Sequence, residues 1–505
     1  MKKLMLSLYP FLIACYPVLA LRNYNINYVD FASIFRTLIL VIILTALGWL
    51  VVGLFVRDQI RSGILTSLMI ILAFAYGHIY IQSEKILGEP IRHGSLVILL
   101  GIIFLSIVWL VHKYPSASET IRNFLITTAV TLFLMSVGQS LFYEYSAYRA
   151  MKILSVEDDP SGVIINPGNH PDIYLIVLDA HGRADRLQEE FDYDSSAFIR
   201  ELDDMKFYIA NCSQSNYAST NLSLSSLFRM NYIPPILSDT ARLPPLKESI
   251  VNQTIVSNGY TVITFENRAS GHFDLQEDIR LSQNQLALGE FSLMGGLNEF
   301  EKIMLNTSMT RLFLDAPIIP GFNKDGLTKL EDFEHYTQTR FILSKLHEVP
   351  QLKSPKFVFV HILVPHSPYI FTADGKFRSK EDRSKQGYRD NVEFIDTNIL
   401  PAIHAILDKS QQPPIVILMG DHGPPPGKRF ATREGRMSIL NAIYADDVTK
   451  AQLYNSISPI NSFRVIFNRY FGGNYPILDD LSYFAYKLNQ LADAPIVENT
   501  CNAPE

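Results

Sequence analysis

Cysteine is scarce in this chain, and charged residues are fewer than in most soluble proteins. The 505 residues include three cysteines, and charged residues make up 19%. No CxxC pair or zinc-finger spacing occurs, which excludes the common small zinc domains. The net charge of −6 gives a general nucleic-acid-binding role no electrostatic support. No repeat of solenoid length is present, which excludes a stacked-repeat architecture.

Hydrophobic residues are abundant, at 48%, and the long apolar runs lie almost entirely before residue 145. Each run has roughly 17–20 residues, which is the length needed to cross a bilayer core. Buried helices of a soluble domain are the alternative, but the charges sit only in short connectors and leave no polar face for water. We therefore predict about five transmembrane helices in residues 1–145, at Leu4–Leu21, Thr37–Val56, Gly63–Ile81, Ser95–Val111 and Phe124–Phe142.

The orientation in the membrane follows from the number of spans. With Lys2 and Lys3 inside, an odd number of spans places the rest of the chain outside. Lysine and arginine are about equally frequent on the two sides, so the positive-inside rule does not decide the orientation. The first run also fits a signal peptide ending at Val18–Ala20, and Leu12–Cys15 resembles a lipoprotein box. Removing this segment would leave the same orientation. We expect a multi-pass protein of the cell membrane whose large domain faces the periplasm or exterior.

The two cysteines of the large domain, Cys212 and Cys501, would then lie in an oxidising compartment. Their wide separation in the sequence leaves open whether they pair. The polar stretch "VEDDPSGVIINPGNHPD" (Val156–Asp172) is rich in proline and glycine, so we assign residues 146–170 as a linker. Residues 171–505 then form a separate catalytic domain.

Short apolar runs in residues 171–505 suit buried parallel strands, and helical patterns lie between them. The runs are Ile173–Asp179, Tyr260–Glu266, Lys356–Leu363 and Pro414–Asp421. Helical periodicity follows in Ser195–Met205 and Asn391–Leu407. This alternation predicts a layered α/β domain.

Polar side chains end several of these predicted strands. Asp179 ends the first, Asp421 and His422 end the last, and the His361–His366 segment follows a third. Ligands gather beyond the carboxyl ends of strands in such sheets. Two carboxylates and an imidazole suit a divalent cation such as zinc or manganese. The alternatives are that the aspartate caps a helix and that Asp-His-Gly is an ordinary turn.

A hydroxyl-rich stretch, "SNYASTNLSLSSLFRM" (Ser215–Met230), leads into a helical pattern. Ser219 or Thr220 is a natural N-cap for that helix. A hydroxyl at a helix N-terminus faces free N–H groups and the positive end of the helix dipole, which favour a phosphoryl oxyanion. The alternative is a capped helix with no chemistry.

Four stretches, in this order, resemble the sulfatase-like branch of the alkaline phosphatase superfamily: "DIYLIVLDAHGRAD", "NYASTNLSLSSLF", "FVFVHILVPHSPY" and "VILMGDHGP". With five predicted spans before them, the layout is similar to that of lipoteichoic acid synthases and lipid A phosphoethanolamine transferases. The resemblance implies an N-terminal transmembrane bundle followed by an α/β/α sandwich of alkaline phosphatase type.

The resemblance also implies roles for individual residues. Asp179, Thr220, Asp421 and His422 match the metal ligands of the family, although the transferases use glutamate where this chain has Asp179. Thr220 also matches the threonine nucleophile. His366 matches a histidine that contacts the substrate phosphate or the leaving group.

Three further residues have weaker assignments. Arg229 is a candidate substrate-binding residue that would contact an anion, whereas His361 and His181 have no counterpart and are expected to be structural. His181 is close to Asp179 in the sequence and could contact a metal ligand without binding the metal itself. Sulfatases need a cysteine or serine for conversion to formylglycine, followed by proline and arginine. Thr220–Leu224 has none of these at the matching positions, which argues against a sulfatase mechanism.

These residues together predict a metal-dependent enzyme that moves a phospho-alcohol group, of the phosphoglycerol or phosphoethanolamine type. The donor would be a membrane lipid, the acceptor an envelope glycan or lipid, and the intermediate a phosphothreonine. One alternative is a hydrolase of phosphate or sulfate esters. Another is a catalytically inactive, membrane-anchored binding module. The predicted site retains side chains that are capable of catalysis, which argues against this alternative.

Overall fold

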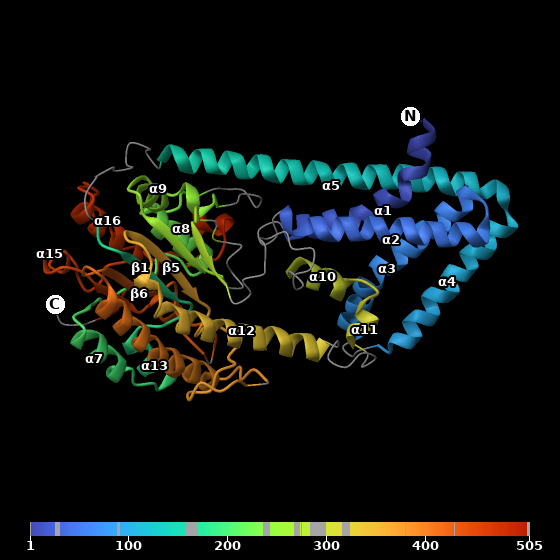
Figure 1. Ribbon diagram of the computed structural model, residues 1–505. Coiled ribbons are helices and arrows are strands. Elements are labelled where there is room, and N and C mark those ends of the chain that lie inside the picture. The colour runs from blue at the N-terminus through green and yellow to red at the C-terminus, as the bar shows by residue number, and fades with distance from the viewer. Residues whose placement is uncertain are drawn as a thin grey trace. The chain divides into compact units, whose positions relative to one another are not determined.

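The chain forms two compact units in the computed structural model (Figure 1). The first unit comprises Met1–Tyr145 with Leu286–Thr328, and the second comprises Ser146–Gln285 with Lys329–Glu505. The structure describes residues 2–25, 31–87, 91–157, 170–235, 243–266, 273, 275–282, 299–315, 324–378, 380–428 and 430–501.

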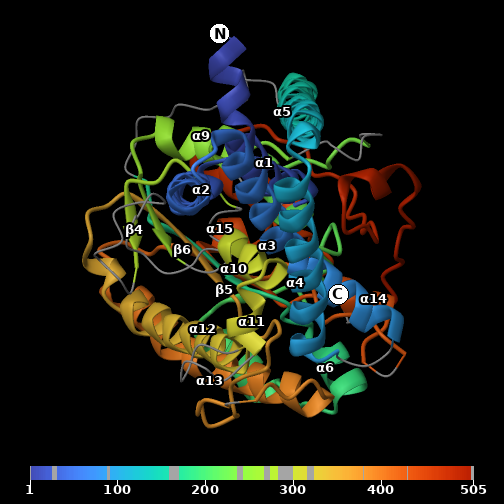
Figure 2. The ribbon, with the colours of Figure 1, turned by 90° about the vertical axis from the view of Figure 1, so that its right-hand side faces the viewer.

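The first unit is built from long apolar helices, several of which pack side by side (Figure 2). They are α1 (Lys2–Tyr24), α2 (Phe35–Val56, after the 3-10 turn Ala32–Ile34), α3 (Gln59–Leu87), α4 (His93–Lys113) and the first part of α5 (Pro115–Glu157). Four helices in the described part of the chain, α2 to α5, are long and apolar enough to cross a membrane. Helix α1 covers the first predicted span, whose membrane crossing stays a prediction.

Large apolar side chains on α2 and α4 remain exposed. Leu54 is 67% exposed and Phe55 is 84% exposed on α2, and Leu105 is 65% exposed on α4. Such a surface would be unfavourable in water, whereas lipid chains solvate it without cost. These helices therefore form a transmembrane bundle, as predicted.

Residues 299–315 lie within the sequence range that we predicted to be the catalytic domain, yet they belong to the first unit. Helices α10 (Glu299–Thr307) and α11 (Arg311–Asp315) follow one another there, and α10 contacts α3. Helix α5 also continues to Glu157, through part of the predicted linker, and residues 158–169 lie outside the described residues.

The second unit contains a seven-stranded sheet with the order β2-β7-β6-β1-β5-β3-β4. Strand β1 pairs in parallel with both β5 and β6, and β7 is antiparallel to β6. The strands are β1 (Ile173–Leu178), β2 (Tyr208–Ile209), β3 (Thr261–Phe265), β4 (Ile279–Leu281), β5 (Lys356–Ile362), β6 (Ile415–Gly420) and β7 (Asn441–Tyr444). The four predicted strands are confirmed as β1, β3, β5 and β6, whereas the short edge strands β2 and β4 and the four-residue strand β7 were not predicted.

Helices cover both faces of this sheet (Figure 1). Leu175 of β1 packs toward α8 (Thr220–Arg229), α9 (Ile250–Ser257) and α16 (Pro459–Tyr470). Its neighbour Ile176 packs toward α7 (Ser196–Asp204), α12 (Lys324–Leu346) and α13 (Lys385–Lys409). Because β1 is buried on both faces, it reads as a continuous apolar run. The predicted α/β/α sandwich is confirmed.

Shorter helices connect these layers. They are α6 (Ala184–Phe191), α14 (Arg433–Met437) and α15 (Asp447–Lys450), with 3-10 turns at Leu246–Glu248, Val349–Gln351 and Leu488–Asp493.

Candidate active site

The candidate site lies at the carboxyl ends of three adjacent parallel strands. Asp179 directly follows β1, and Asp421 and His422 directly follow β6. On the other side of β1, His361 is the penultimate residue of β5 and pairs with Val177. Because β6, β1 and β5 are neighbours in the sheet, their carboxyl ends bring these four side chains together.

His422 is at the centre of the cluster. Its Nε2 atom lies 3.3 Å from Asp421 Oδ2 and 3.7 Å from Asp179 Oδ1. The same atom lies 3.2 Å from Thr220 Oγ1, across a sequence separation of 202 residues. On the far side of Asp179, its Oδ2 atom lies 3.2 Å from His361 Nε2. The structure therefore brings the predicted nucleophile and the predicted Asp-His pair into direct contact.

Thr220 is the first residue of α8, and Ser219 occupies the N-cap position without a side-chain capping hydrogen bond. The Ser223 hydroxyl, one turn into the helix, donates a hydrogen bond of 2.7 Å to the Asp421 carbonyl oxygen. This bond fixes the start of α8 to the end of β6. The Thr220 hydroxyl therefore lies where the free N–H groups and the positive end of the helix dipole favour negative charge.

The side chains present fit a divalent cation. Within the described part of the chain, the buried oxygens Asp179 Oδ1 and Asp421 Oδ2 accept no hydrogen bond. Potential ligand atoms of Asp179, His361 and Asp421 all lie within 4.8 Å of one another. Burying uncompensated carboxylate oxygens is costly, and a cation bound between them would remove that cost. Carboxylate, imidazole and hydroxyl groups are suitable ligands for zinc or manganese.

The surroundings keep Asp179 and His422 in the protonation states that metal ligands need. Burial alone would raise the pKa of Asp179, but His366, His361 and His422 together outweigh burial and hold that pKa below its usual value. Burial, with the nearby positive charge of Arg436, lowers the pKa of His422 from 6.5 to about 4. Asp179 is therefore ionised and His422 neutral at neutral pH, as metal ligands must be.

His366 is partly exposed, as is Thr220. Its ring centroid lies 6.3 Å from that of His422, and its Nδ1 atom lies 2.6 Å from the Ser367 carbonyl oxygen. This carbonyl orients the ring by accepting a hydrogen bond from Nδ1. A substrate can reach His366, whereas His422 behind it is buried.

Two other residues considered in the sequence lie elsewhere. Arg229 is the last residue of the ten-residue helix α8, so it lies roughly 13 Å along the helix axis from Thr220. The structure does not bring Arg229 to the cluster. His181 contacts α13 and not the cluster: its Nε2 atom lies 2.7 Å from Asp396 Oδ1.

Two residues that the sequence analysis did not assign to the site, His361 and Arg436, lie beside it, and the structure contains one bond that the sequence left open. His361 was expected to be structural, although an imidazole in the apolar run "FVFVHIL" is itself a signal of a polar partner. Arg436, which hydrogen-bonds beside the site, carries no sequence signal that we can identify. Cys212 and Cys501 form a disulfide bond.

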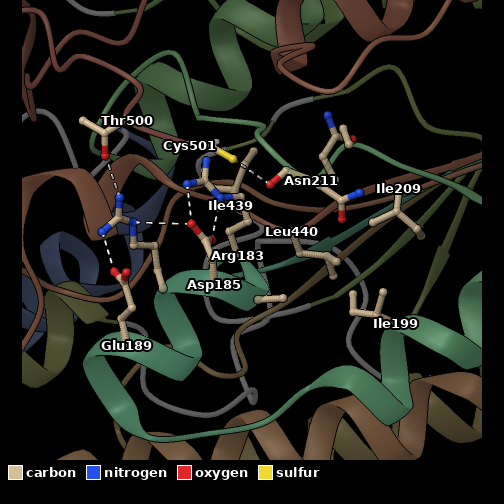
Figure 3. Close-up of a pocket in the computed structure, with 14 residues that line it drawn as sticks. Arg183, Asp185, Glu189, Ile199, Ile209, Asn211, Ile439, Leu440, Thr500 and Cys501 are labelled. Carbon is tan, nitrogen blue, oxygen red and sulfur yellow. Dashed lines mark hydrogen bonds and ion pairs between the residues drawn. The ribbon is translucent and has the colours of Figure 1, made fainter. Parts of the chain in front are cut away.

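A cavity of about 580 Å³ lies near the disulfide, and none of the candidate site residues lines it (Figure 3). Its charged side chains are paired with each other: Arg183 with Asp185, and Arg186 with Glu189. The figure shows these pairs on one side and Ile199, Ile209 and Leu440 on the other. The candidate active site is therefore the buried cluster at the strand ends.

Comparisons with known proteins found solved structures that are similar to this chain at low sequence identity. No protein-family model and no curated protein matches the chain. The integral membrane lipooligosaccharide phosphoethanolamine transferase A (EptA) from Neisseria meningitidis is similar over 97% of each chain, with 13% identity and a TM-score of 0.39.

Several solved structures are similar to part of the chain, among them the following two. The periplasmic domain of EptC from Escherichia coli, in complex with zinc, matches 66% of this chain and 94% of its own, with 11% identity and a TM-score of 0.41. An alkaline phosphatase superfamily protein from Vibrio parahaemolyticus matches 67% of this chain and 81% of its own, with 12% identity and a TM-score of 0.39. At such identities and TM-scores the function must be argued from the site itself.

Proposed function

We propose that this protein is a membrane-anchored, metal-dependent transferase that moves a phospho-alcohol group from a lipid to an envelope acceptor. The group would be of the phosphoglycerol or phosphoethanolamine type, carried as a phosphothreonine on Thr220. The observation that supports this most directly is the position of the Thr220 hydroxyl, 3.2 Å from His422 Nε2 and at the N-terminus of α8. A helix N-terminus favours the anionic phosphoryl group beside a hydroxyl nucleophile.

Asp179, Thr220, Asp421 and His422 would hold the metal ion, and the position of His361 allows it to assist through Asp179. When bound, a divalent cation lowers the pKa of a hydroxyl and offsets negative charge on phosphoryl oxygens. The free N–H groups at the start of α8 stabilise the same charge. The Thr220 hydroxyl releases its proton to water, its oxygen forms a bond to phosphorus, and the bond from phosphorus to the lipid alcohol breaks.

His366 would supply the proton that the leaving lipid alcohol needs. It is the histidine of the site that a substrate can reach, and its ring lies beside that of His422. In the second step, His366 takes a proton from the acceptor hydroxyl, whose oxygen bonds to phosphorus and releases Thr220. The choice between an acceptor hydroxyl and water separates a transferase from a hydrolase.

The membrane helices give this chemistry a source of substrate. A lipid donor diffuses in the bilayer, and an enzyme held in the same bilayer meets it at a raised effective concentration. We further propose that the catalytic domain faces the periplasm or exterior, where envelope glycans and lipids are available.

Mass spectrometry of the Thr220 peptide tests the proposal. The full chain, purified in detergent, is incubated with total membrane lipids and zinc or manganese and then digested. We expect a phospho-alcohol adduct on Thr220, and its mass names the head group. Adding envelope glycans should discharge the adduct into a glycan product, whereas discharge into water alone would indicate a hydrolase.

Substitutions at two adjacent hydroxyls give a matched control. Thr220→Ala should remove the adduct, and Thr220→Ser should retain a part of it because the oxygen remains. Ser219→Ala should form the adduct normally, since the Ser219 side chain makes no capping hydrogen bond. Absence of any adduct in the wild-type chain with both metals would contradict the proposal and favour a binding module.

A further inference from the structure

We infer that Arg436 is a positioning residue that holds the Thr220 loop against the Asp421–His422 turn. The inference rests on the proposed function. Arg436 lies in the short helix α14 (Arg433–Met437) and is 6% exposed. Its Nε and Nη2 atoms donate hydrogen bonds of 2.9 and 2.6 Å to the Ala218 carbonyl oxygen. Its Nη1 atom donates a bond of 2.8 Å to the Gly423 carbonyl oxygen.

The two carbonyl groups belong to the two parts of the site. Ala218 comes two residues before Thr220, and Gly423 comes directly after His422. One planar guanidinium group therefore bridges the segment that carries the nucleophile and the turn that carries the Asp-His pair. A guanidinium group suits this role because its donors are arranged in a rigid fork.

The Gly423 carbonyl also sets the orientation of the His422 ring. His422 Nδ1 lies 3.0 Å from the Gly423 oxygen, which can only accept a hydrogen bond, so the proton is on Nδ1. The Nε2 lone pair then faces Thr220 and the two carboxylates. By holding the carbonyl that orients His422, Arg436 acts on a predicted metal ligand from behind it.

The backbone around Arg436 interlocks with the same turn. The Gly423 N–H group donates a bond of 2.7 Å to the Arg436 carbonyl oxygen, and the Ser215 N–H group donates one of 2.7 Å to the Met437 carbonyl oxygen. A Cβ atom at Gly423 would lie 2.1 Å from the Gly435 oxygen, so only glycine allows this approach. Helix α14 thus contacts both catalytic segments through its backbone as well.

The C-terminal segment completes the support from the other side. The Ala218 N–H group donates a bond of 3.1 Å to the Ala485 carbonyl oxygen. The ring of Tyr486 lies against the guanidinium group, with its centroid 5.5 Å from Arg436 Cζ. The Ala218 residue is therefore held at its N–H group by Ala485 and at its carbonyl group by Arg436. A lysine at position 436 could not reproduce this fork.

The bonds to backbone carbonyls make Arg436 a support for the site rather than a substrate-binding group. Removing the fork should therefore loosen the site geometry and lower kcat while leaving KM nearly unchanged. Residues that orient metal ligands from behind typically contribute about 10–100-fold in metal affinity or activity.

Arg436→Lys in the full chain, in detergent, tests the inference with zinc as the metal probe. We expect kcat to fall by about 10–100-fold, KM to change by less than about 3-fold, and the zinc dissociation constant to rise by about 10-fold. Zinc affinity, measured by chelator competition, does not depend on turnover.

Arg464→Lys is the matched control. Arg464 is also buried, and its Nε and Nη1 atoms donate bonds of 2.7 and 2.6 Å to the Met230 and Pro476 carbonyl oxygens. This variant should lose a similar amount of thermal stability but keep the wild-type kcat and zinc affinity. If Arg436→Lys behaves like Arg464→Lys in both measurements, Arg436 is only structural and the inference is overturned.

A second variant covers the case in which Arg436→Lys fails to fold. Tyr486→Leu keeps Arg436 and removes the ring against which its guanidinium group packs. We expect a fall in kcat at constant KM, and an unchanged kcat would overturn the inference. A wild-type chain that binds no zinc and forms no Thr220 adduct would instead refute the proposed function, so the two failures are distinguishable.

Discussion

At the residue scale, the neutral imidazole of His422 links the site to pH. Its pKa is lowered from 6.5 to about 4, first by burial and then by Arg436. The unfolded chain takes up this proton near pH 6.5, whereas the folded chain resists it until near pH 4. The contribution to stability is therefore present above pH 6.5 and is lost as the pH falls toward 4.

This difference predicts the acid response of the metal-free chain. Because the pKa of His422 differs between the folded and unfolded chain, lowering the pH from 7 to 5 should reduce the free energy of unfolding by about 2 kcal/mol. Thermal denaturation in a chelator should show a larger decrease for the wild type than for His422→Gln, whose side chain stays neutral. Equal decreases in both proteins would show that His422 is not the titrating group.

A buried ion pair at the other end of the sheet governs stability without touching the site. Lys356 Nζ, 0% exposed, lies 2.5 Å from Asp172 Oδ2 and also donates hydrogen bonds to the Pro350 and Leu352 carbonyl oxygens. Lys356→Ala leaves the Asp172 carboxylate buried without its charged partner and should cost about 3–5 kcal/mol in unfolding free energy. Adduct formation by the folded fraction should stay normal. Lys356→Met with Asp172→Leu should recover part of the loss, as measured by denaturant unfolding.

At the scale of elements, the backbone of α3 lies in direct contact with the backbone at the end of α10 and just after it. The Met309 N–H group donates a bond of 2.7 Å to the Ala73 carbonyl oxygen, and a Cβ atom at Gly77 would lie 2.3 Å from the Thr307 carbonyl carbon. Arg36 on α2 adds an ion pair to Glu301, with its Nε atom 2.6 Å from Glu301 Oε1. These contacts explain why residues 299–315 belong to the membrane unit.

Gly77→Ala should therefore detach this segment locally. The added methyl group meets backbone that cannot rotate away, which typically costs about 1–3 kcal/mol. Hydrogen exchange of residues 299–315 should become faster. Gly101→Ala on α4 is the control, because a Cβ atom there meets nothing within 4 Å. Equal exchange rates in the two variants would contradict the packing described here.

At the scale of the whole molecule, the Cys212–Cys501 disulfide ties the end of the chain to the segment before Thr220, across 289 residues. Asn499 supports the same junction by donating a bond of 2.6 Å from its side chain to the Cys212 carbonyl oxygen. Disulfides form and persist in oxidising compartments, which agrees with a domain outside the cytoplasm.

Peptide mapping without reduction should find Cys212 linked to Cys501 in protein taken from membranes, with Cys15 left as the free thiol. Reduction should lower the stability of the α/β unit by about 2–4 kcal/mol. Cys15→Ser should change neither result. Alkylation of both Cys212 and Cys501 in freshly isolated membranes would contradict the proposed external location.

Much of the fold could be predicted from local patterns in the sequence. The apolar runs predicted the membrane helices because a bilayer sets the length of a span. The continuous runs in β1, β3, β5 and β6 predicted buried parallel strands, since both faces of such strands are covered. The edge strands β2 and β4 have two and three residues, too few for a periodicity to show.

The sequence by itself determined the membrane bundle, the α/β/α sandwich and a short set of candidate groups that included Asp179, Thr220 and His422. Only the tertiary structure decided which groups meet, because strand order and register are set by contacts between residues far apart in the chain. That order brought His361 to Asp179, left Arg229 at the far end of α8 and closed the disulfide. It also placed Arg436 between Ala218 and Gly423. Arg436 contacts the backbone carbonyl groups of these residues, and such a contact cannot be predicted from the pattern of side chains in the sequence.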